Sequence, residues 1–146
     1  MTSMRRPLVA ANWKMNGSHA SNEGWVKSFV PNAASLRCDV VVCAPFVYLS
    51  TLGRSLAPAE LGAQDLSPRA AGAFTGDVAA EMLADVGCRW VIVGHSERRQ
   101  LHAETDAVVA AKAARALQAG LRPIVCVGET LADRDAGRTQ EVVGAQ

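Results

Sequence analysis

The stretch WVIVGHSERR, from Trp90 to Arg99, joins an apolar strand directly to a row of polar side chains. The three branched residues at 91–93 favour a packed, pleated strand. Gly94 allows a sharp exit from that strand and a close approach of the backbone to a ligand. A histidine, a serine and a glutamate follow at 95–97. The stretch therefore predicts a strand whose carboxyl end opens into a functional site.

Similar apolar runs recur along the chain, with helical patterns between them. We predict strands at 8–11, 40–44, 61–64, 90–93 and 123–127, and helices at 22–30, 47–56, 78–86 and 106–118. This alternation predicts an α/β fold with a parallel sheet, covered by helices on both faces and connected by right-handed crossovers. No linker or low-complexity tract interrupts the chain, so residues 1–146 are expected to form a single domain.

The helix at 106–118 has the clearest signals. Thr105 is placed to cap its first N–H groups, and Val109, Ala113 and Leu117 are predicted to share the face that packs on the core. Two sheet architectures remain open on the alternation alone, a β/α barrel and an open doubly wound sheet. Nucleotide-binding versions of the doubly wound sheet lose support, because no GxGxxG or GxxxxGK[ST] motif is present.

Composition excludes several classes of function. The 146 residues are 49% hydrophobic and carry a net charge of +1, with no long basic block for nucleic acid or an anionic membrane. The longest apolar run, 40–49, is too short to span a bilayer. Four cysteines without a CxxC pattern indicate reduced thiols and a cytoplasmic protein, and the three histidines lack metal-ligand spacing. We therefore expect no metal and no membrane or nucleic-acid partner, whereas a small anionic ligand remains possible.

Polar residues follow four of the five predicted strands, at 12–17, 64–65, 94–97 and 128–130. The carboxyl ends of parallel strands share one edge of a sheet, where ligands bind in such folds. Each residue also has a simpler interpretation. His95 alone is equally consistent with a helix cap, Lys14 with a side chain reaching solvent, and Glu97 with a carboxylate at a helix start.

Taken together, four motifs are far more specific than any of them singly. AANWKMNG at 10–17, GAFTGD at 72–77, VIVGHSERR at 91–99 and CVGET at 126–130 resemble, in this order and spacing, the triosephosphate isomerase family. The resemblance covers essentially the whole chain. It implies a (β/α)8 barrel and an isomerase that interconverts dihydroxyacetone phosphate and glyceraldehyde 3-phosphate through an enediolate, with no cofactor.

The resemblance also implies roles for individual residues. His95 would be the neutral electrophile at a helix N-terminus, in a family that is an established example of protonation states set by environment. Lys14 would stabilise the phosphate and the developing oxyanion, and Asn12 would donate a hydrogen bond to the substrate. Glu97 would orient the lysine. Thr75 would cross the interface of a homodimer to support the partner's site.

The chain departs from this family in length. Family barrels have eight βα units in about 250 residues, whereas only five strands are predicted here, an incomplete barrel. The resemblance places the catalytic base on a glutamate after the sixth strand, and no glutamate of this sequence matches it. We therefore expect the 146-residue polypeptide alone to be inactive. The alternative is a non-catalytic half-barrel that binds phosphorylated ligands or a partner chain. Exposed edges at the first and fifth strands predict association or a partly molten state.

Overall fold

The computed structural model describes residues 5–146 and contains one sheet of five parallel strands. The strands are β1 (Leu8–Asn12), β2 (Asp39–Ala44), β3 (Glu60–Ala63), β4 (Cys88–Val93) and β5 (Arg122–Val125). Their order in the sheet is their order in the chain. The five predicted strands are therefore confirmed, with small shifts at their ends.

Seven helices are present among the described residues. They are α1 (His19–Ala33), α2 (Phe46–Leu52), α3 (Ala80–Asp85), α4 (Ser96–Leu101), α5 (Asp106–Gln118), α6 (Leu131–Asp135) and α7 (Thr139–Ala145). Helix α1 begins at His19, earlier than predicted, because Ser18 and Ser21 form a reciprocal cap in which each side chain accepts from the other's backbone N–H.

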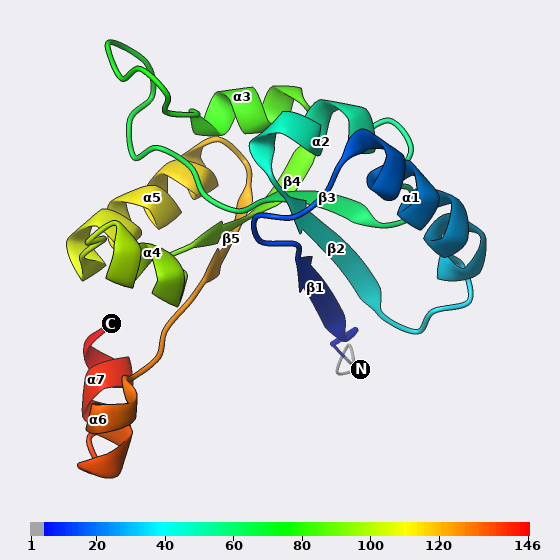
Figure 1. Ribbon diagram of the computed structural model, residues 1–146. Coiled ribbons are helices and arrows are strands. Elements are labelled where there is room, and N and C mark those ends of the chain that lie inside the picture. The colour runs from blue at the N-terminus through cyan, green and yellow to red at the C-terminus, as the bar shows by residue number, and fades with distance from the viewer. Residues whose placement is uncertain (1–4) are drawn as a thin grey trace.

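The sheet has two different faces. Helices α1, α2, α3 and α5 form an arc over one of them (Figure 1), and the main core lies between these helices and strand residues such as Val42 and Ala44. The alternate residues Val41 and Cys43 point to the other face, where they form a smaller cluster with Ile92. The prediction of helices on both faces is therefore wrong. On this second face the sheet carries the small cluster of Val41, Cys43 and Ile92 instead of a layer of helices.

The sequential strand order also decides between the two architectures left open by the sequence. A doubly wound sheet reverses its strand order at a switch point and carries helices on both faces. Here neighbouring strands in the chain are neighbours in the sheet throughout. The arrangement is that of successive units of a β/α barrel.

The predicted bounds of helix α5, 106–118, are confirmed. Its predicted cap is confirmed as well, because the Thr105 hydroxyl accepts from the backbone N–H of Val108. Its predicted core face is wrong at one position. Val109 is 3% exposed but Leu117 is 64% exposed, whereas Lys112 and Ala116 are buried. At 3.6 residues per turn, Leu117 lies about 80° around the helix from Val109, whereas Ala116 lies only about 20° away.

This difference gives a stability prediction. Val109→Ala is expected to lower the free energy of unfolding by about 1–3 kcal/mol, because it leaves a void in the core. Leu117→Ala is expected to change it by less than about 0.5 kcal/mol, as for most exposed positions. Urea denaturation of both variants measures the difference. Equal losses would mean that Leu117 packs on the core after all.

The thiols of Cys43 and Cys88 give a second prediction. Both cysteines are buried and free, and burial raises the pKa of each to about 12. Because the thiolate is the reactive form, both are expected to resist alkylation by iodoacetamide at pH 8 and to react once the chain unfolds. Mass spectrometry of the alkylated peptides with and without denaturant measures this. Rapid labelling of the folded chain at either position would contradict the prediction.

Candidate active site

A cavity of about 280 Å³ lies at the carboxyl ends of β1, β3 and β4. Four of the residues predicted from the sequence contribute to its lining, namely Asn12, Lys14, His95 and Glu97. Asn12 is the last residue of β1 and Lys14 follows it, and His95 and Glu97 follow β4. The parallel sheet thus brings together side chains that are more than eighty residues apart in the chain.

Lys14 and Glu97 form the closest polar contact in this cavity. The Lys14 ammonium donates to a carboxylate oxygen of Glu97 at 2.5 Å. This hydrogen bond is the main cause that holds the pKa of Glu97 below its usual value. The ion pair therefore persists at neutral pH and weakens only as the pH falls through that lowered pKa. A fixed cation at the mouth of a cavity is suited to an anionic ligand.

The backbone at Lys14 is held in an unusual conformation. Its φ of +53° lies in the left-handed region, which non-glycine residues seldom adopt. The Asn12 side-chain oxygen accepts from the Lys14 N–H at 3.0 Å, and the Gln64 amide donates to the Lys14 carbonyl at 2.9 Å and to the Cys43 carbonyl at 3.0 Å. These bonds compensate for the strain and fix the direction of the lysine side chain.

Gln64 is the residue at this site whose importance sequence reasoning missed. The sequence showed it among the polar residues at a strand end but assigned it no role. Its amide links the ends of β1, β2 and β3. The only signal in the sequence was a polar amide directly after a short apolar strand, and that pattern does not reveal which backbone groups the amide will reach.

His95 is both a cap and a cavity residue. Its Nδ1 atom accepts from the Glu97 backbone N–H at 3.2 Å and so caps α4. An amide N–H can only donate, so Nδ1 is the acceptor in this hydrogen bond and Nε2 is the ring nitrogen left to donate. The Glu97 carboxylate lies 3.5 Å from Nδ1, too far for a competing hydrogen bond. The ring is therefore arranged to donate from Nε2.

A largely buried group of four charged residues, two of which also line the cavity, was not predicted. Lys112 donates to Asp65 at 2.7 Å and to Glu104 at 2.6 Å, while Arg98 pairs with the same two carboxylates at 3.0 and 2.7 Å. Burial raises the pKa of Asp65 despite its cationic neighbours. Burial acts in the same direction on Glu104, but hydrogen bonds from Lys112 and Arg98 outweigh it and lower the pKa of Glu104. This ionic cluster fixes α4 and α5 against the end of β3.

Thr75 does not line the cavity of its own chain. It lies in the segment between β3 and α3, which projects from the body of the molecule in Figure 1. Phe74 beside it is 42% exposed, and the Arg69 guanidinium lies 5.4 Å from the centre of its ring. An exposed aromatic in a projecting segment is suited to contact with another chain.

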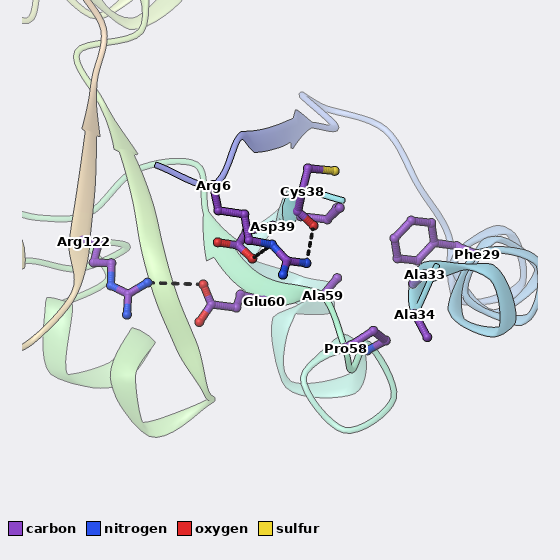
Figure 2. Close-up of a pocket in the computed structure, with 11 residues that line it drawn as sticks. Arg6, Phe29, Ala33, Ala34, Cys38, Asp39, Pro58, Ala59, Glu60 and Arg122 are labelled. Carbon is purple, nitrogen blue, oxygen red and sulfur yellow. Dashed lines mark hydrogen bonds and ion pairs between the residues drawn. The ribbon is translucent and has the colours of Figure 1, made fainter. Parts of the chain in front are cut away.

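A second cavity of about 330 Å³ lies at the opposite, amino ends of the strands (Figure 2). Its charges are paired with one another: Arg6 bonds Asp39 at 2.8 Å, and Arg122 lies 3.5 Å from Glu60. Figure 2 shows both pairs as dashed contacts. These four charges are therefore balanced within the cavity, and no residue that was predicted from the sequence for the functional site lines it.

Residues 5–146 contain neither a metal-binding group of side chains nor a membrane-spanning helix. No group of three or more histidine, cysteine or acidic side chains is placed to hold a metal ion in this range. No helix in the same part of the chain has the length and apolar character needed to cross a bilayer.

Sequential parallel βα units with polar groups at the carboxyl ends of their strands define the class of β/α-barrel enzymes. Comparison with known proteins identifies the family within that class. A sequence model described as triosephosphate isomerase matches residues 7–146. The chain belongs to the triosephosphate isomerase family.

Individual relatives agree with this assignment. Triosephosphate isomerases of Albidiferax ferrireducens and Cupriavidus taiwanensis are 56% and 54% identical to the chain, over 98% of its length in each case. The crystal structure of triosephosphate isomerase from Bartonella henselae superimposes with a TM-score of 0.90 at 38% identity and covers 97% of the chain. The chain spans 59% of the two relatives and 60% of the crystallised chain. Its five strands are therefore part of a TIM barrel.

Proposed function

We propose that this chain supplies the electrophilic and phosphate-binding part of a site that interconverts dihydroxyacetone phosphate and glyceraldehyde 3-phosphate through an enediolate. One structural observation supports the proposal in addition to family membership. The Lys14 ammonium, held by Glu97, and the His95 ring, capped at Nδ1, line the same cavity at the strand ends. A fixed cation and a neutral donor are what a phosphorylated substrate with a developing oxyanion requires.

Each residue has a role that its contacts support. Lys14 attracts the phosphate and stabilises the oxyanion, and Glu97 orients Lys14 through their 2.5 Å contact. His95 donates from Nε2 to the substrate carbonyl, because Nδ1 is already used by the Glu97 N–H. Asn12 uses its side-chain oxygen to hold Lys14, which leaves its amide N–H groups to donate to the substrate. None of these roles needs a cofactor.

Proton abstraction needs a base in addition to these groups. The family resemblance assigns that base to a glutamate after the sixth strand, and no residue of this sequence matches that position. We therefore propose that the 146-residue polypeptide alone has no turnover above background. We also propose that the complete site works in a cytoplasmic homodimer, in which Thr75 of the projecting loop reaches the partner's Lys14 and His95.

Complementation tests the proposal. The 146-residue chain is assayed alone and after mixing with a polypeptide that carries the portion of the A. ferrireducens relative beyond the matched region. The expected result is no turnover alone and measurable turnover in the mixture. Substantial turnover by the chain alone would overturn the inactivity proposal. Demonstrated association without turnover would instead favour a non-catalytic half-barrel that binds phosphorylated ligands or a partner.

A further inference from the structure

Arg99 makes three hydrogen bonds to three different parts of the fold. Its Nε atom donates to the Gly94 carbonyl at 2.8 Å, Nη1 donates to the Asp106 carboxylate at 2.5 Å, and Nη2 donates to the Cys126 carbonyl at 3.3 Å. Gly94 follows β4, Asp106 begins α5 and Cys126 follows β5. The Arg99 side chain is only 15% exposed, so its bonds to the two carbonyls are partly sheltered from water, whereas the Asp106 side chain is 52% exposed.

The Gly94 peptide that Arg99 holds is tightly constrained. Gly94 has a φ of +68°, and a Cβ atom at this position would lie 2.7 Å from a methyl group of Val109 and 3.1 Å from Nη2 of Arg99. The backbone thus turns through a conformation that suits glycine and is enclosed by α5 and the guanidinium. Rotation of this peptide would break the bond from Arg99 Nε.

The residue that follows this peptide is His95. Its carbonyl accepts from the backbone N–H groups of Arg98 and Arg99 at 2.8 and 3.1 Å, and its ring accepts from the Glu97 N–H. The imidazole direction therefore depends on the backbone on both sides of His95. The helix α4 fixes the following side, and the bond from Arg99 to the Gly94 carbonyl fixes the preceding side.

We infer that Arg99 is a positioning residue for His95: its guanidinium ties the Gly94 carbonyl to the Cys126 carbonyl at the end of β5 and thereby keeps the His95 ring on the Glu97 N–H. A planar guanidinium with donors on three nitrogens suits this task, because a lysine ammonium cannot span three acceptors in fixed directions. The inference deepens the proposed function, since it concerns the residue proposed as electrophile.

Chemical modification of His95 tests the inference without any need for turnover. Diethyl pyrocarbonate acylates an unprotonated imidazole nitrogen, and in His95 that nitrogen is covered by the Glu97 N–H. Peptide-resolved mass spectrometry follows the rate at each histidine of the full 146-residue chain. Arg99→Met is expected to raise the His95 rate severalfold relative to His19, which lies at the start of α1. Arg99→Lys is expected to give a smaller increase.

Asp106→Asn is the matched control, because it weakens only the contact to α5 and leaves the bonds to Gly94 and Cys126. Its His95 rate is expected to match the unsubstituted chain. Wild-type rates in both Arg99 variants would overturn the inference. So would an equal rise at His19 and His95, which indicates general loosening, or an equal effect of Asp106→Asn. Because activity is not the readout, failure here and failure of the proposed reaction are separate results.

Discussion

The His95→Gln variant, mixed with the complementing polypeptide, is expected to lose turnover by about 10²- to 10³-fold, the usual effect of removing a preorganised donor to a developing oxyanion. In the structure the ring accepts from the Glu97 N–H at Nδ1, and His95 is one of the residues that line the cavity. Glutamine is uncharged and retains an N–H donor, but it lacks the rigid ring that directs the donor. Steady-state kinetics of the mixture measure the loss as a fall in kcat.

His19→Gln is the control for this experiment. His19 lies at the start of α1, where its ring packs edge-on against Tyr48, and it does not line the cavity. This variant is expected to retain the turnover of the unsubstituted mixture. If His95→Gln retained it as well, His95 would be no more than the cap of α4, which is the simpler interpretation that its sequence position also allowed.

Replacing Lys112 by methionine is expected to have the largest effect on stability. Lys112 is 4% exposed and pairs with Asp65 and Glu104, whose side chains are 13% and 7% exposed. Removal of Lys112 leaves two carboxylates with Arg98 as their one cationic partner in this cluster, and breaking a buried ionic group in this way typically costs about 3–5 kcal/mol. That is a large part of the total for a small domain, about 5–15 kcal/mol. Thermal and urea unfolding measure the loss.

Two further variants separate charge from packing. Lys27→Met removes a lysine whose pair with Glu23 is exposed to solvent, and it is expected to leave the unfolding midpoint unchanged. The double variant Lys112→Met with Glu104→Gln is expected to be more stable than Lys112→Met alone, because the cluster then holds one carboxylate for its one remaining cation, Arg98, instead of two. If the double variant were the less stable of the two, the loss would come from packing rather than from unpaired charge.

Much of the fold could be predicted because its signals are local. Branched apolar runs gave the five strands, and the Thr105 cap gave the start of α5. The face that each element presents was harder to predict. Leu117 is apolar and helical, but rotation around α5 carries it to solvent, and a charged residue, Lys112, occupies the buried side. The sequence does not show that two carboxylates and a guanidinium from other segments will surround that lysine.

The residues of the candidate site could be predicted where they lie at the carboxyl ends of strands. Asn12, Lys14, His95 and Glu97 were expected together because parallel strands share one edge, and they line one cavity. The residues that hold them were not predicted. Gln64 and Arg99 act through backbone carbonyls, and a carbonyl carries no sequence signature that would show which side chain will reach it. The catalytic roles proposed for the site residues are predictions, which the experiments above test.

The sequential order of the strands has a consequence for how the chain forms during synthesis. Each strand pairs with the strand that precedes it by one βα unit, so no pairing among the five waits for a distant part of the polypeptide. The sheet can therefore grow strand by strand as the chain leaves the ribosome, N-terminal units first. At each stage the newest strand presents one open edge of backbone N–H and C=O groups. In this chain that edge belongs to β5, and a further parallel strand would pair with it.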